Sequence, residues 1–131
     1  MLIEIDFQSE EAIYMQLRNQ IIMGIATSMI HEGDTLPSVR QLAGDIGINM
    51  HTVNKAYAVL RQEGFVTIDR RKGAVIAVDA DKLEAVQELR ARFEVLIAKA
   101  VCKGISRGEV HEMVDEIYDS LLRGRNIEDQ I

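Results

Sequence analysis

The chain has 131 residues, 47% of them hydrophobic, and its 15 Lys and Arg against 21 Asp and Glu give a formal net charge of −6. This length fits one domain of the usual ~100–200 residues with a modest appendage, the apolar share excludes wholesale disorder, and the acidic excess by itself counts against a polyanionic partner. The single cysteine excludes an intramolecular disulfide and a multi-thiolate zinc site. Because no run reaches the ~20 apolar residues of a membrane helix and the acidic start lacks a signal peptide's basic region, we expect a soluble, reduced, cytoplasmic protein.

The first helical pattern covers residues 11–31. Apolar side chains form a broad face along it, at Ile13, Leu17, Ile21, Met23, Ile25 and Met29. Ser9 is placed to cap the start of this helix, and Gly33 is placed to end it. Residues 34–36 then leave room only for a very short strand.

Two further helices are predicted over residues 38–45 and 49–63. Pro37 suits the start of the first, because a missing N–H costs nothing in the first turn. Gly47 and Ile48 make a tight turn, Asn49 is a good N-cap for the second helix, and Gly64 ends it. The inward-facing residues of the two helices would be Val39, Leu42, Ala43, Ile46, Val53, Ala56, Tyr57 and Leu60.

A hairpin follows the helices. Two β-branched runs, residues 65–69 and 74–78, are separated by Arg70-Arg71-Lys72-Gly73, which predicts two strands with a basic tip. Two helices that close on a short glycine-containing turn, followed by a hairpin, define a winged helix-turn-helix. We therefore predict a mainly α fold with a small β-hairpin, in which residues 1–79 form a DNA-binding domain.

The charge of this region differs from that of the whole chain. Residues 50–78 contain five Lys and Arg against two acidic residues, a local net charge of +3. Phosphate binding depends on the field within about a Debye length, ~8 Å at physiological salt. The negative total therefore does not exclude DNA.

Residues 80–131 read as two amphipathic helices that form a dimerisation region. In the first, over residues 81–103, the apolar positions follow coiled-coil-like spacing: Val86, Leu89, Phe93, Leu96 and Ala100. Gly104 breaks this helix, Ser106 and Glu109 form a capping box, and Gly124 would close the second helix. Its apolar positions are Val110, Met113, Val114, Ile117, Tyr118 and Leu121. Pairing with a twofold mate would cover both faces; the alternative is a monomer whose helices fold back on the winged domain.

Three motif blocks resemble the GntR family of bacterial transcription regulators. They are Ile13-Tyr14-x-Gln16-Leu17, Gly33-Asp34-x-Leu36-Pro37-Ser38-x-Arg40-x-Leu42-Ala43, and Thr52-Val53-x-Lys55-Ala56-Tyr57-x-x-Leu60-x-x-Glu63-Gly64. The resemblance covers roughly residues 8–78, and the short helical C-terminus is similar to the YtrA-type subfamily, whose members dimerise through two C-terminal helices. It implies a homodimeric regulator of double-stranded DNA, in most members a repressor. About fifty residues follow the hairpin, too few for the large effector or aminotransferase-like domains of other subfamilies. A small-molecule effector would have to bind between the two regions or at the dimer interface.

The N-terminal part of the second helix of such a motif enters the major groove. With Val53 facing the core, the groove-facing candidates are Met50, His51, Thr52 and Asn54. The resemblance adds Arg40 of the Pro-Ser-x-Arg motif and brings the hairpin tip to the minor groove. The predicted DNA-binding set is Ser38, Arg40, Asn49, Met50, His51, Thr52, Asn54, Lys55, Arg70, Arg71, Lys72 and Gly73.

Each assignment has a structural alternative. In that alternative, Asn49 and Thr52 only cap the helix and Arg40 is a solvated helix residue. The cationic residues 70–72 then simply form a soluble loop. The chain also departs from the family pattern at two places. Many members carry Arg where this chain has Met50, which leaves a guanine contact without a counterpart. The tip lacks the common Gly-x-Gly-x-Phe sequence.

The sequence offers little for catalysis. His111-Glu112-Met113-Val114-Asp115 resembles a zinc-protease helix, but Asp115 replaces the second histidine, so we predict no metal, no cofactor and no enzyme. Cys102 is expected to be a small hydrophobe on a buried or interfacial face. Two alternative functions remain: a winged domain that binds protein instead of DNA, and a metal- or redox-responsive sensor that uses Cys102 or the histidines.

Overall fold

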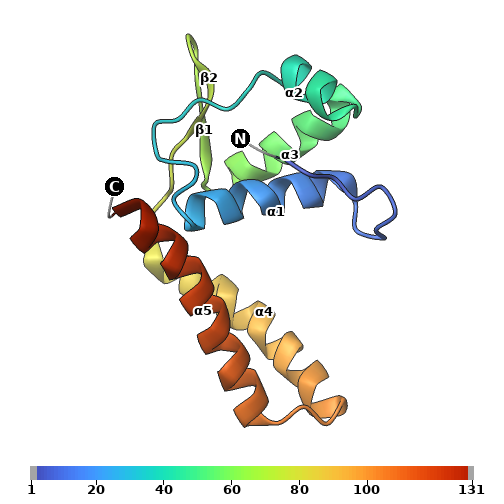
Figure 1. The fold of residues 1–131 in the computed structure, drawn as a ribbon, viewed down its shortest axis with the longest axis vertical. Coiled ribbons are helices and arrows are strands. Elements are labelled where there is room, and N and C mark those ends of the chain that lie inside the picture. The colour runs from blue at the N-terminus through green and yellow to red at the C-terminus, as the bar shows by residue number, and fades with distance from the viewer. Residues whose placement is uncertain (1–2, 130–131) are drawn as a thin grey trace. The chain divides into compact units, whose positions relative to one another are not determined.

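A computed structural model describes residues 3–129 and the side chains of residues 3–125. It contains α1 (Ile13–Ala26), α2 (Val39–Ile46), α3 (Met50–Gln62), β1 (Val66–Asp69), β2 (Gly73–Ile76), α4 (Lys82–Cys102) and α5 (Arg107–Asp129) (Figure 1). The chain forms two compact units. The first unit consists of two segments of the chain, the residues up to Asp79 and those from Leu122 onwards. The second unit is Ala80–Leu121. The mainly helical fold with one hairpin is as predicted.

The first unit is built around α3. Helices α1 and α2 both pack against α3, and β1 covers its C-terminal end (Figure 1). The core is apolar throughout: Leu17, Ile21, Ile30, Leu36, Leu42, Ala43, Val53, Ala56, Tyr57, Leu60, Val66, Ala74 and Ile76. The helix that is expected to read DNA is therefore held from three sides, and its remaining surface is free.

Helix α1 is shorter than the sequence pattern predicts. It begins after Ala12, which makes no side-chain cap, while the Ser9 hydroxyl accepts from the N–H of Glu11 outside the helix. It ends at Ala26 instead of near Gly33, because Ser28 adopts a left-handed backbone (φ 62°) and the chain turns back to bury Ile30. That turn places Ile30 against Gly24, where a Cβ would lie 2.6 Å from the Ile30 side chain. The predicted apolar positions Met23 and Met29 are exposed as a result.

The two helices of the helix-turn-helix are capped by side chains at their starts. The Ser38 hydroxyl accepts from the N–H of Gln41 at 3.1 Å, and the side-chain oxygen Oδ1 of Asn49 accepts from the N–H of His51 at 2.7 Å. Between them Gly47 takes a left-handed conformation (φ 81°), which ends α2 and allows the tight turn. Asn49 is thus the predicted N-cap, and Ser38 caps α2 directly after Pro37.

The hairpin pairs β1 with β2 in antiparallel register, from Val66 opposite Ile76 to Asp69 opposite Gly73. Thr35 forms an isolated bridge with Val75, which is the very short strand expected near residues 34–36. This bridge joins the base of the hairpin to the segment that leads into α2.

The second unit consists of α4 and the greater part of α5. The predicted capping box is present: the Ser106 hydroxyl accepts from the N–H of Glu109, and the Glu109 carboxylate accepts from the N–H of Ser106. No side chain between residues 80 and 121 is buried. Cys102 is likewise exposed in the single chain, so of its two expected settings, buried or interfacial, it is not buried within the chain, and the interfacial one stays a prediction. No helix in the described part of the chain has the length and apolar character to cross a bilayer.

Gly124 does not close the second C-terminal helix. Helix α5 continues through it to Asp129, and the backbone at Gly124 is closely approached by Thr27. A Cβ there would lie 3.1 Å from the Thr27 Cβ. The glycine therefore serves close packing within the first unit instead of helix termination.

Candidate nucleic-acid interface

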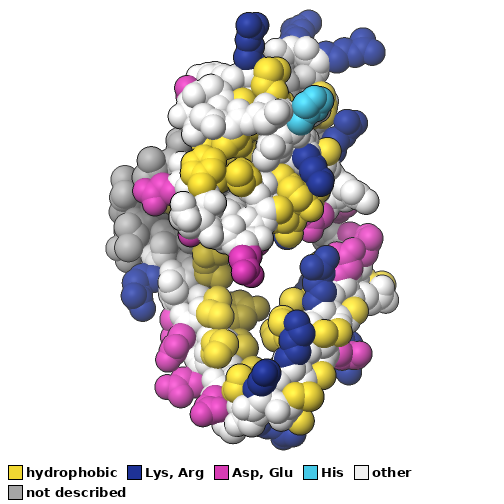
Figure 2. All heavy atoms as spheres, turned by 90° about the vertical axis from the view of Figure 1, so that its right-hand side faces the viewer, with side chains coloured by type: hydrophobic (Ala, Val, Ile, Leu, Met, Phe, Trp, Pro, Cys, Tyr) yellow, Lys and Arg dark blue, Asp and Glu magenta, His cyan; other side chains and the backbone are white. Residues whose placement is uncertain are grey.

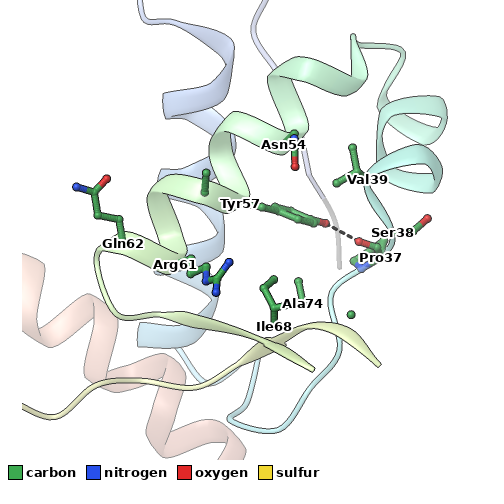
Figure 3. A pocket seen from close by; sticks show the side chains of 11 residues that line it. Pro37, Ser38, Val39, Asn54, Tyr57, Arg61, Gln62, Ile68 and Ala74 are labelled. Carbon is green, nitrogen blue, oxygen red and sulfur yellow. Dashed lines mark hydrogen bonds between the residues drawn. The ribbon is translucent and has the colours of Figure 1, made fainter. Parts of the chain in front are cut away.

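Tyr57 fixes α3 to the start of α2. Its side chain is 6% exposed, and its hydroxyl donates to the Pro37 carbonyl at 2.7 Å (Figure 3). Burial raises the pKa of the phenol well above its ordinary value of 10.0, so Tyr57 stays neutral and remains a donor. As predicted, Tyr57 is a core residue, and it positions the Pro37-Ser38 segment beside the recognition helix.

An open hollow of about 510 Å³ lies at the N-terminal end of α3. Four of the predicted DNA-binding residues line it, and α2 adds a fifth side chain: Val39, Asn49, Met50, His51 and Asn54. Met50, His51 and Asn54 are exposed, and Val39 is half-buried. The structure therefore brings three of the four predicted groove-facing residues of α3 together on one surface, without Thr52.

A second open hollow, of about 650 Å³, lies between α3 and the hairpin (Figure 3). It brings the predicted residues Ser38, Asn54 and Gly73 together with residues that the sequence reading did not select. These are Arg61, Gln62 and Ile68, all of them exposed. Because Asn54 lines both hollows, the two form one continuous surface along α3.

The tip of the hairpin is organised by Asp69. One carboxylate oxygen of Asp69 accepts from the N–H groups of Arg71 at 2.7 Å and of Lys72 at 3.0 Å. The N–H of Lys72 and then that of Arg71 lower the pKa of Asp69, so this carboxylate stays charged. Gly73 completes the turn with φ 83°. The turn leaves the three cationic side chains exposed, and Figure 2 shows cationic side chains gathered at one end of the molecule.

The remaining predicted residues lie around these surfaces. Arg40 is exposed in the first turn of α2, and no described residue bonds to its guanidinium. Thr52 is half-buried in α3. Lys55 differs, because its ammonium lies 4.1 Å from the centre of the Tyr14 ring on α1. Lys55 is thus placed at the side of α3 that faces α1, away from both hollows.

Three residues of these surfaces were not predicted from the sequence or were assigned another role. Val39 is predicted to be buried but lines both hollows, because it is the first residue of α2 and faces α3 across the turn. Arg61 lies seven residues after Asn54, hence on the same helix face, and this spacing is a signal that was available. Asp69 precedes the basic tip by one residue, where Asp commonly bonds backbone N–H groups two residues on.

The described residues contain no cluster of three or more His, Cys, Asp or Glu side chains able to hold a metal ion.

Residues 9–76 match the family described as bacterial regulatory proteins, gntR family. The chain belongs to the GntR family. The HTH-type transcriptional repressor YtrA of Bacillus subtilis (strain 168) is 32% identical over 130 residues, which cover 95% of this chain and 98% of that protein. This similarity over nearly the whole length agrees with the predicted likeness to the YtrA-type subfamily.

Solved structures give the same assignment for this GntR-family chain. YtrA from Sulfolobus acidocaldarius, itself a GntR-family transcription factor, is 37% identical, with a TM-score of 0.66 over 78% of this chain and 99% of that one. A transcriptional antiterminator from Listeria monocytogenes EGD-e is 29% identical, with a TM-score of 0.82 over 92% of each chain. This GntR-family protein is thus a DNA-binding transcription regulator with a winged helix-turn-helix.

Proposed function

We propose that this GntR-family regulator is a homodimeric repressor that binds a palindromic operator in a sequence-specific manner. The repressor part is supported by the similarity to the Bacillus subtilis protein named as a transcriptional repressor. Such a regulator acts on chromosomal DNA, which would place it in the bacterial cytoplasm and on the nucleoid when it is bound.

The observation that carries the dimer is the exposed apolar surface of α4 and α5. Phe93 is 37% exposed and Leu96 is 58% exposed, although both belong to the predicted seam. Apolar side chains run along both helices in Figure 2. The complete set of seam residues is Val86, Leu89, Phe93, Leu96, Ala100, Val110, Met113, Val114, Ile117 and Leu121, and none of them is buried in the single chain. A face this apolar indicates a partner.

We infer that the partner is a second copy of the chain, because a dimer would also let two DNA-binding units engage one operator. A closed twofold dimer buries the same face on both copies. It also presents two recognition helices about one helical turn, ~34 Å, apart, which is the spacing that a palindromic operator requires. Simultaneous engagement of both half-sites raises the affinity through the effective concentration of the second.

The DNA contacts proposed for each protomer follow the two hollows and the tip. Met50, His51 and Asn54 would face base edges, with Asn49 and Thr52 at the start of the helix. Ser38, Arg40 and Arg61 would contact the DNA backbone around them, whereas the predicted Lys55, which lies over the Tyr14 ring, would stay outside these contacts. Arg70, Arg71 and Lys72 would neutralise phosphates beside the minor groove, and Gly73 allows a close approach of the backbone.

The dimer is tested by placing a charge in the seam. Phe93→Glu should convert the chain to a monomer in sedimentation velocity and weaken operator binding at least tenfold, because a buried unpaired carboxylate is strongly unfavourable. Ala91→Glu is the matched control, because residues two apart on a helix do not share a face. A monomeric wild-type chain, or a Phe93→Glu variant that remains dimeric, would contradict the proposal.

A further inference from the structure

The recognition end of α3 carries an apolar side chain at the first position of the helix. Met50 is 50% exposed and belongs to no core cluster of the winged unit. Val39, the first residue of α2, lies in the same hollow. These two side chains, from different helices, thus form one apolar floor on the surface proposed to face DNA. A single exposed methionine would need no explanation, but a shared apolar floor does.

The rim of this hollow is polar and free of acidic groups. Asn49 has its carbonyl oxygen occupied by the N–H of His51, whereas no described residue bonds to the amide of Asn54. Arg61 lines the adjoining hollow, which shares Asn54 with this one. An apolar floor with a neutral polar rim, set in a region of net positive charge, is complementary to a base edge next to phosphates.

We propose that this hollow receives the C5-methyl group of a thymine in the major groove of the operator. This inference rests on the proposed function. The thymine methyl is the one apolar group that an unmodified base pair presents in the major groove, whereas guanine, cytosine and adenine present donors and acceptors there. Where those polar groups lie against Val39 and Met50 they would lose water, and these two apolar side chains offer no hydrogen bond in return. The hollow therefore selects thymine by its methyl group.

The experiment removes the methyl and nothing else. An operator is first obtained by selection from random-sequence duplexes with the full-length dimer. Each thymine of a half-site is then replaced by deoxyuridine, symmetrically in both halves, and affinity is measured by fluorescence anisotropy at one salt concentration. We expect one position at which uracil weakens binding about 3- to 5-fold per half-site, the value of one buried methyl.

A Met50 variant shows whether the thymine methyl contacts Met50 directly or affects binding through the shape of the DNA. In Met50→Ala the uracil penalty at that position should fall below about 1.5-fold, since the methyl no longer has its partner. Met23→Ala is the matched control, because Met23 is 51% exposed on α1 and lies outside both hollows. It should retain the full penalty. Cytosine at the same position should bind weakly, and 5-methylcytosine should recover part of the loss.

The outcomes separate this inference from the proposed function. If the dimer selects an operator but no thymine methyl contributes, or if Met50→Ala keeps the full penalty, the thymine assignment is overturned while the regulator assignment stands. If selection yields no preferred sequence and binding shows no salt dependence, the proposed function itself fails.

Discussion

The hydroxyl of Tyr57 donates to the carbonyl oxygen of Pro37 at 2.7 Å, and this bond ties the middle of α3 to the residue before the cap of α2. Two segments with predicted DNA contacts, Ser38–Arg40 and the start of α3, are thereby held next to each other by one part-buried hydrogen bond. The bond also gives the Pro37 carbonyl, which no helix or strand ladder serves, a donor.

Tyr57→Phe tests this contact. We expect a loss of about 1 kcal/mol in unfolding free energy, the typical net value of one hydrogen bond, and a few-fold weaker operator binding. Because the folded state raises the pKa of Tyr57, the wild type gains stability below the ordinary pKa of 10.0 and loses it as pH rises above that value. The variant should therefore lose less stability than the wild type between pH 9.5 and about pH 11. Chemical denaturation across that range measures it, and equal losses would contradict the assignment.

Asp69 offers a test of the hairpin tip. Asp69→Ala removes the oxygen that accepts from the N–H groups of Arg71 and Lys72, so these two amides should exchange faster with solvent and operator binding should weaken. Asp69→Asn loses the same negative charge as Asp69→Ala but keeps an acceptor oxygen for these two N–H groups, so it should bind the operator more tightly than Asp69→Ala. Hydrogen exchange measures the protection of the two amides, and fluorescence anisotropy measures the operator affinity of each variant. Equal affinity of the two variants would show that the tip needs no such support.

The low pKa of Asp69 gives this turn a pH dependence. A folded-state pKa below the ordinary value means that the stabilisation is present above that ordinary value and is lost as pH falls through the lowered one. The amide protection of Arg71 and Lys72 should therefore persist at neutral pH and disappear under acid conditions.

Arg18 and Glu63 join α1 to the end of α3. The Arg18 guanidinium lies 3.2 Å from the carboxylate, and the two side chains are 15% and 31% exposed. Arg18→Met should lower the unfolding free energy by about 1–2 kcal/mol, because Glu63 is left partly buried without its partner. The exposed pair Arg90 and Glu94, at 3.9 Å and 83% and 73% exposed, is the control. Arg90→Met should change stability by less than about 0.5 kcal/mol. Similar losses for both substitutions would contradict this reading.

Two arginines separate specific from general DNA binding. Arg40→Ala should weaken operator binding severely, whereas Arg71→Ala should weaken all sequences alike and reduce the salt slope by about one unit. Salt titrations on operator and scrambled duplexes measure both. Operator affinity that is unchanged in Arg40→Ala would remove Arg40 from the interface.

Much of the local structure in both units could be predicted because its signals are local. Asn49, Gly47 and the Ser106–Glu109 pair act through backbone bonds within a few residues, so their roles can be read from spacing. The end of α1 could not be predicted in this way. It depends on Ile30 turning back to fill the core beside Gly24, a tertiary contact that overrides the helical pattern of residues 27–31.

The candidate DNA interface likewise has features that local sequence signals predict and features that depend on tertiary contacts. The grouping of Met50, His51 and Asn54 could be predicted because an N-cap and a helical period place them on one face of α3. Val39 was not, because a first-turn residue of α2 looks like a core residue until α3 is placed across the turn from it. Gly124 is a similar case: the sequence suggests a helix end, and only the approach of Thr27 explains the missing side chain.

The most direct test of the account is a hydroxyl-radical footprint of the dimer on its selected operator. The account predicts two symmetric protected patches, centred about 10 base pairs or a multiple of that apart, with protection in the major groove and beside the adjacent minor groove. A single unsymmetrical patch, or uniform protection without sequence preference, would contradict it.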